Sequence, residues 1–243
     1  MASDDKGQTQ SQRVAKRIRD LIMTGQIEPG ARLYEQPLTA LTGASRTPVR
    51  AALSELANEG MVTYTPNRGY EVRRFTLDDV IDAYRVRAVL EGLACKTAAE
   101  IGLRPSAEEA LTEAVEAVDA ILEPGRLNDG DREAWQRWNV QFHQTIIAAS
   151  RNANLPKVLA VVTNIPMVSN SMVSWYDFES VRRFHEHHRR VLDMIRRQKP
   201  GRAEALMREH IEQASDFIYD IFTGSSSASD GRPPILASSA AAS

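Results

Sequence analysis

The sequence has few of the features that indicate a secreted or membrane-spanning protein. It contains a single cysteine among its 243 residues, Cys95, so no disulfide can form within the chain. No apolar run approaches the roughly 20 residues that a helix needs to cross a bilayer. The first residues, MASDDKGQTQSQ, lack the apolar core of a secretory signal. We therefore expect a cytoplasmic protein with no membrane partner, in which Cys95 is a small buried residue rather than a reactive thiol.

The sequence also lacks the short motifs of common enzyme classes. It has no glycine-rich phosphate-binding loop, and the string HEHH at residues 185–188 is not the H-E-x-x-H of a metalloprotease. No carboxylate stands at a spacing that nominates a general base. These absences predict that the chain is not an enzyme. A metal-dependent enzyme remains an alternative, because three histidines could hold zinc with one position open.

Charge is distributed unevenly along the chain. Residues 11–74 contain ten Lys or Arg and six Asp or Glu, whereas residues 75–243 contain nineteen and twenty-four. The chain as a whole has a formal net charge of -2. A basic segment followed by an acidic body favours contact with a polyanion at the N-terminal end only.

Residues 11–75 have the pattern of a winged helix-turn-helix domain. Apolar residues at helical spacing, beginning with Val14 and Ile18, predict a helix over 12–24, and shorter helices follow over 35–41 and from Ser45 to Asn58. After Gly60 the apolar period changes to two on both sides of a Pro-Asn-Arg-Gly turn, which predicts a β-hairpin. Residues 1–10 and 223–243 are expected to be disordered tails.

Residues 76–222 are predicted to be helical throughout. We place helices near 77–101, 105–123, 129–150, 153–174, 178–198 and 201–222, with breaks at Arg-Pro-Ser, Pro-Gly and Lys-Pro-Gly. The fold class is therefore mainly α, with a winged helix-turn-helix followed by an antiparallel six-helix bundle.

Three strings in the N-terminal domain resemble the GntR family of bacterial regulators. They are IxxGxIxPGxRLxE at residues 22–35, SRTPVRAALSELANEGMV at 45–62, and the wing PNRGYEV at 66–72. The helical domain resembles the FCD sensor domain of the FadR subgroup, in its shorter VanR-type form. The resemblance implies a homodimeric transcriptional regulator that binds double-stranded operator DNA and responds to a small carboxylate effector.

The predicted DNA-contacting residues lie at the start of the third helix and at the tip of the wing. A recognition helix presents its N-terminal residues to base edges, and arginine can make two hydrogen bonds to a guanine. Glycine at the wing tip permits close approach of the backbone to the minor groove, and other basic residues can contact phosphates. The predicted residues are Arg32, Ser45, Arg46, Thr47, Arg50, Arg68 and Gly69.

All five histidines fall in the helical domain, and three of them occupy apolar stripes on different helices. Asn139 and His143 are four residues apart, while His188 and His210 lie on the last two helices. Three imidazoles and an amide converging in one bundle favour a divalent metal site, with zinc as the first choice and nickel or manganese as alternatives. Core histidines satisfied by one another are the other interpretation. We interpret His185 and His187, which fall off the stripe, as surface residues or partners of the ligands.

The FCD resemblance supports these four ligands and adds one effector-binding residue. The family pattern has an acidic or amide residue followed by a histidine, and then one histidine on each of the last two helices. Its usual first ligand is aspartate, so Asn139 should weaken metal binding while leaving more positive charge to attract an anionic effector. Arg87 resembles the family arginine that binds an effector carboxylate, although an ion pair with Glu91 is the simpler interpretation. A DNA-binding protein whose second domain only dimerises is a further alternative.

Overall fold

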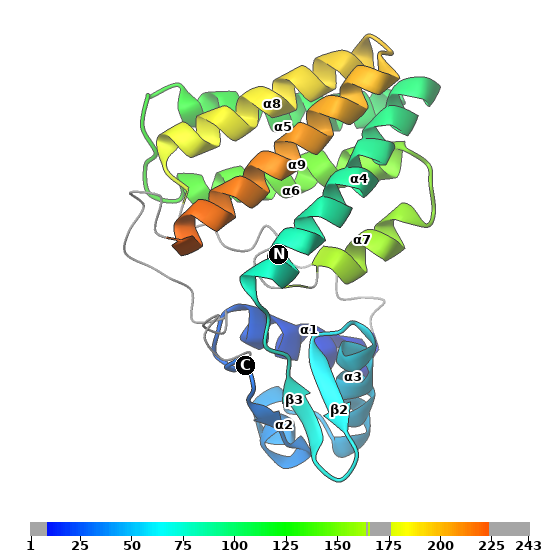
Figure 1. Ribbon diagram of the computed structural model, residues 1–243, viewed down its shortest axis with the longest axis vertical. Helices are drawn as coiled ribbons and strands as arrows, with labels where there is room; N and C mark the ends of the chain where they lie inside the picture. The colour runs from blue at the N-terminus through cyan, green and yellow to red at the C-terminus, as the bar shows by residue number, and fades with distance from the viewer. Residues whose placement is uncertain (1–8, 164, 166–175, 224–243) are drawn as a thin grey trace. The chain divides into compact units, whose positions relative to one another are not determined.

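The computed structural model describes residues 9–163, 165 and 176–223, which form two compact units (Figure 1). The division falls between Leu77 and Asp78. In the described ranges, no helix has the length and apolar character required to cross a membrane.

The N-terminal unit is a winged helix-turn-helix, as predicted. Its interior is formed by the apolar faces of the helices, where Ile18 of the first helix and Val49, Leu53 and Leu56 of the third are fully buried. The elements are α1 (Gln10–Met23), β1 (Arg32–Leu33), α2 (Glu35–Thr42), α3 (Arg46–Asn58), β2 (Val62–Thr65) and β3 (Gly69–Val72).

The sheet of this unit contains one strand more than the sequence predicted. The two-residue strand β1 pairs antiparallel with β3, with Leu33 opposite Tyr70, so that the strand order is β1-β3-β2. The predicted hairpin of β2 and β3 is present. Its turn contains Asn67 at φ 63° and Gly69 at φ 81°, and the second of these is a conformation that glycine adopts without strain.

The first helix begins earlier than predicted, because its start is capped by a residue that we had assigned to the disordered tail. Thr9 Oγ1 accepts a hydrogen bond from the Gln12 backbone N–H at 3.3 Å, and Gln12 Oε1 accepts one from the Thr9 N–H at 2.8 Å. This reciprocal capping box satisfies two N–H groups at the helix start. Helix α9 likewise includes residue 223, and the remainder of both expected tails lies outside the described residues.

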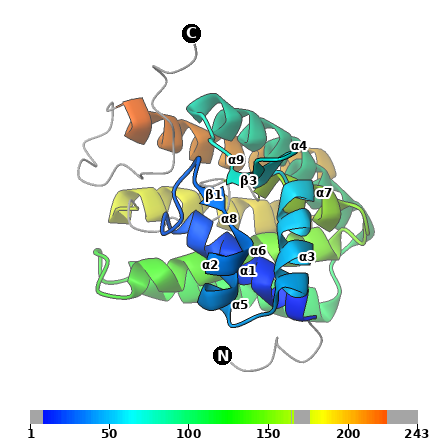
Figure 2. The same cartoon turned by 90° about the horizontal axis from the view of Figure 1, so that it is seen from below.

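The second unit is the predicted antiparallel bundle of helices (Figures 1 and 2). Gly92 of α4 permits a close approach to α9, since a Cβ there would lie 2.7 Å from Cγ of Arg208. Cys95, one turn further along, is fully buried, as predicted. Helix α7 covers only part of the expected 153–174, and the rest of that range, apart from residue 165, is outside the described residues. The elements are α4 (Leu77–Ile101), α5 (Pro105–Leu122), α6 (Asp131–Ala149), α7 (Leu155–Thr163), α8 (Phe178–Arg196) and α9 (Pro200–Thr223).

Candidate metal centre and DNA-contacting surface

Three histidine rings meet in the interior of the helical bundle. His143 of α6, His188 of α8 and His210 of α9 are all buried, and their Nε2 atoms form a triangle. The Nε2 separations are 3.3 Å between His143 and His188, 3.1 Å between His188 and His210, and 3.2 Å between His143 and His210. Phe142 stacks on the His188 ring at 4.3 Å and supports its orientation. The structure thus brings together three of the four predicted metal ligands.

The spacing of these nitrogens suits one divalent ion. Ligands at about 2.0–2.1 Å from a tetrahedral zinc ion lie about 3.3–3.4 Å from one another, close to the observed separations. Burial, together with the neighbouring rings, places the pKa of His188 and of His210 well below the ordinary value. Both rings are therefore neutral at physiological pH, which is the form that binds a metal.

The fourth predicted ligand, Asn139, lies one helical turn before His143. It is buried and lines a small cavity together with His143 and His210. Trp135 lines the same cavity, and its Nε1 has no hydrogen-bond partner among the described residues. The predicted effector residue Arg87 also lines it, so the residues assigned to metal and effector border one space.

A buried carboxylate that we had not assigned to the site connects Arg87 with His143. Glu91 Oε1 accepts a hydrogen bond from Arg87 Nε at 2.5 Å, and its Oε2 contacts His143 Nδ1. The predicted i,i+4 ion pair is thus present, but it is buried and shared with a metal-ligand candidate. Burial would raise the pKa of Glu91, but Arg87 and His143 outweigh it and hold the pKa far below its ordinary value.

Of the two interpretations of His185 and His187, that of surface residues is wrong, and that of partners of the ligands stays a prediction. Both are buried, because α8 packs against its neighbours over a wider face than the apolar pattern indicates. His185 Nε2 contacts Asp119 of α5, which also pairs with Arg189. The His187 ring centroid lies 6.0 Å from that of His210.

A larger cavity lies between α4, α6 and α7 and reaches the pair of Arg87 and Glu91. Its volume is about 500 Å³, and its polar lining includes Arg87, Glu91 and His143. The rest is mostly apolar and includes Ile147 and Leu159. The cavity near His210 measures only about 20 Å³, so the larger one offers the space for an organic ligand.

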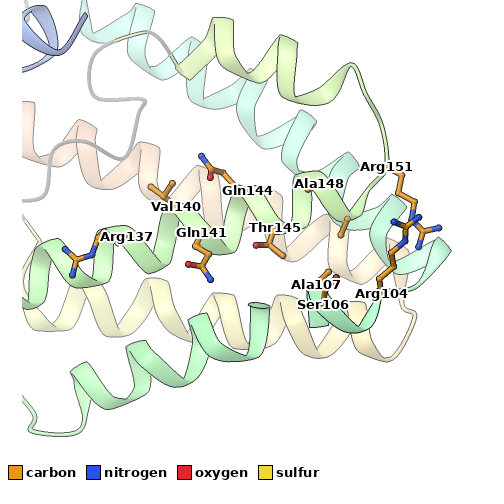
Figure 3. Close-up of a pocket in the computed structure, with 11 residues that line it drawn as sticks. Arg104, Ser106, Ala107, Arg137, Val140, Gln141, Gln144, Thr145, Ala148 and Arg151 are labelled. Carbon is orange, nitrogen blue, oxygen red and sulfur yellow. The ribbon is translucent and has the colours of Figure 1, made fainter. Parts of the chain in front are cut away.

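A further groove of about 540 Å³ follows the outer side of α6 and contains none of the histidines (Figure 3). Arg137 lies toward one end, and Arg104 and Arg151 lie at the other. Gln144 borders both this groove and the cavity described above. The groove therefore adjoins the site without forming part of it.

The predicted DNA-contacting side chains are exposed on the N-terminal unit. Ser45 is the N-cap residue of α3 but makes no side-chain capping hydrogen bond. Arg50 pairs with Glu35 of α2, and the Arg50 side chain remains 67% exposed. Residues Arg32, Ser45, Arg46, Thr47, Arg50 and Arg68 are all exposed, and Gly69 is partly exposed.

Comparison with known proteins identifies both units. Residues 10–72 match the model of the bacterial regulatory proteins of the gntR family, and residues 82–213 match the FCD domain. The Nta operon transcriptional regulator of Aminobacter aminovorans is 28% identical over 197 residues, covering 81% of this chain and 88% of the relative. The "Probable D-xylose utilization operon transcriptional repressor" of Paenarthrobacter nicotinovorans is 30% identical over 207 residues, covering 82% and 85%.

A solved structure shares the fold. E. coli McbR/YncC superposes with a TM-score of 0.68 at 22% identity, covering 88% of this chain and 99% of that one. The family models and the relatives are those of transcription regulators, which excludes the enzyme alternative. With its winged helix-turn-helix and its FCD domain, this chain belongs to the GntR family of DNA-binding transcriptional regulators.

Proposed function

We propose that this regulator binds operator DNA with an affinity controlled by a small carboxylate effector at a metal-containing site in the helical domain. His143, His188 and His210 would hold the divalent ion, with Asn139 as a further ligand. The observation that carries the proposal is the convergence of three buried Nε2 atoms from three helices. FCD domains are known to bind metals, which supports the assignment.

The ligand set favours an anionic effector. Three neutral imidazoles and an amide carry no charge, so a bound divalent ion would offer its positive charge to a carboxylate. Zinc fits histidine nitrogens well, and nickel and manganese are the alternatives. The Trp135 Nε1–H, which has no partner among the described residues, can donate a hydrogen bond to the same carboxylate.

The body of the effector is assigned to the 500 Å³ cavity. Arg87 borders both this cavity and the small one beside His210, so it stands where the carboxylate and the body of a ligand would meet. The apolar lining, including Ile147 and Leu159, suits a hydrocarbon or aromatic portion of the effector.

DNA recognition is assigned to α3 and the wing. Arg46, Thr47 and Arg50 occupy the start of α3, which in a winged helix-turn-helix enters the major groove. Arg68 and Gly69 of the wing would approach the minor groove, while Arg32 and Ser45 would contact phosphates.

Control of DNA binding requires two copies of the chain. We propose a homodimer formed through the helical domain, which would present two winged domains to a two-fold related operator. An effector that favours one arrangement of the bundle would change the spacing of these domains. A coupling free energy of about 1–3 kcal/mol between the two sites is enough to change operator occupancy several-fold.

The experiment that tests the proposal combines metal analysis with effector screening. The purified chain is dialysed against a weak chelator and then offered zinc, nickel or manganese, and metal content is measured per chain. Small organic acids are screened by thermal shift on the metal-loaded and metal-free protein, and positive compounds are added to an operator titration. We expect one ion per chain, and acids that stabilise only the loaded protein and change operator affinity. If the chain binds none of the three metals, the proposed site is wrong.

A further inference from the structure

Glu91 is positioned to fix the tautomer and the ring orientation of His143, and so the nitrogen that faces the other two histidines. It is buried on α4, and each of its two carboxylate oxygens has a different partner, Arg87 or His143. A carboxylate in these contacts accepts hydrogen bonds, so the His143 Nδ1 is the donor. The remaining ring nitrogen, Nε2, then carries the lone pair that faces His188 and His210.

The same contact brings a negative charge close to a ligand set that has none of its own. The candidate ligands are three histidines, so the set contains no carboxylate. The residue one turn before His143 is the neutral Asn139. Histidine ligands commonly donate their second ring N–H to a carboxylate, which fixes the tautomer and makes the ligating nitrogen more basic.

We infer that Glu91 is a positioning residue for the metal centre, and that its charge, transmitted through His143, replaces the carboxylate ligand that Asn139 does not provide. This inference rests on the proposed metal site. It adds a residue from α4 to a centre whose ligands all come from α6, α8 and α9.

Glu91 has a second role that any test must separate from this one. Its ion pair with Arg87, which lies on the same helix, also neutralises a buried guanidinium. The two roles make opposite predictions for Arg87. If the pair acts only as a structural support, removing the charge of Arg87 and removing that of Glu91 should weaken metal binding equally. If the charge of Glu91 serves the metal, removing the positive Arg87 should tighten metal binding.

The affinity for zinc and for Co²⁺ is measured by competition with a chelator of known affinity, using the full chain. We expect Glu91→Gln to weaken binding about 10- to 100-fold. Asn139→Asp in the Glu91→Gln background should recover most of that loss, because it returns a carboxylate directly to the metal. Arg87→Met should bind more tightly than the wild type. The Co²⁺ absorption spectrum reports whether the coordination geometry is retained in each variant.

Glu91→Gln removes the carboxylate that pairs with the buried Arg87, and this loss can by itself prevent the variant from folding. The double variant Arg87→Met/Glu91→Gln removes both charges and avoids this problem. It should bind metal about 10- to 100-fold more weakly than Arg87→Met.

The possible outcomes distinguish the inference from the proposed function. A wild type that binds neither zinc nor Co²⁺ would overturn the metal site and the inference together. A wild type that binds metal, with a folded Glu91→Gln variant of equal affinity, would overturn the inference alone. Equal weakening by Arg87→Met and Glu91→Gln would reduce Glu91 to a structural partner of Arg87.

Discussion

Three buried imidazole rings that face one another lower the stability of the fold unless a donor or a cation satisfies their nitrogen lone pairs. Their Nε2 atoms approach within 3.1–3.3 Å, and each neutral ring has one N–H and one lone pair to offer. If His143 donates its N–H to Glu91, as we infer, its Nε2 can only accept. A cation at the centre would then satisfy the lone pairs that face it, and its binding free energy would add to the stability of the folded state.

Metal removal should therefore destabilise the protein, and His188→Ala should abolish this metal dependence. At an ion concentration about 1,000 times the Kd, binding contributes about 4 kcal/mol to the free energy of unfolding. Thermal unfolding with and without zinc measures the contribution. His187→Ala, which alters a buried histidine of the same helix outside the triangle, is the matched control and should retain the zinc-dependent shift. The same zinc-dependent shift in both variants would argue against His188 as a ligand.

Glu35 forms an ion pair with Arg50 in the free protein. Glu35 therefore competes with DNA for the Arg50 side chain. The hydrogen bond from Arg50 lowers the pKa of Glu35, so the carboxylate stays ionised at physiological pH. We expect Glu35→Gln to raise DNA affinity by a few-fold at most, because an exposed ion pair of this kind is weak. Fluorescence anisotropy titrations at several salt concentrations measure the change. Glu28→Gln removes the same charge from an exposed position of the same unit, and an equal gain in that control would contradict a specific role for the pair.

The sequence predicts the histidine triangle better than its surroundings, for a physical reason. His143, His188 and His210 each occupy an apolar stripe, which a helix directs into its bundle. The contact between Glu91 and His143 spans 52 positions, and no local pattern encodes it. The spacing of Arg87 and Glu91 does give a signal, but four-residue ion pairs are common on exposed helix faces. His185 could not be placed correctly, because its contact is with Asp119 of α5, which is distant in the sequence.

At the scale of secondary structure, the elements that follow from local chemistry are those that could be predicted. Helix α3 begins after Ser45, contains Pro48 in its first turn and places Val49, Leu53 and Leu56 on one face. The strand β1 has only two residues, too few for an alternating pattern to be visible. It exists because Leu33 pairs with Tyr70 of β3, a residue distant in the sequence that no local pattern connects with it.

The exposed arginines of α3 should dominate operator recognition. We expect Arg46→Ala or Arg50→Ala to weaken specific binding by about 1–3 kcal/mol if the replaced side chain contacts a guanine. Gel-shift or anisotropy titrations on DNA from the protein's own promoter region measure the loss. Arg182→Ala removes an exposed arginine from α8 in the other unit and should leave affinity nearly unchanged. Wild-type affinity in both α3 variants would refute their role in recognition.

At the scale of the whole molecule, α4 offers a face on which a second copy can pack. Several of its large apolar residues are exposed at helical spacing, which places them on one side of the helix. A face of this kind is a candidate site for the association of two copies. The residues are Val86, Val89, Leu93 and Ile101.

Placing a charge on this face should therefore separate the dimer and weaken operator binding together. We expect Val89→Glu, and more strongly Val89→Glu/Leu93→Glu, to sediment as a monomer at micromolar concentration where the wild type is a dimer. A carboxylate buried at the interface would lack a partner, and its desolvation opposes association. Operator affinity should fall because one winged domain makes too few contacts for a two-fold related site.

Val161→Glu, at a similarly exposed position on α7, is the control and should remain dimeric. A wild type that sediments as a monomer both with and without DNA would contradict the homodimer itself, whereas a dimeric Val89→Glu/Leu93→Glu variant would move the interface away from α4.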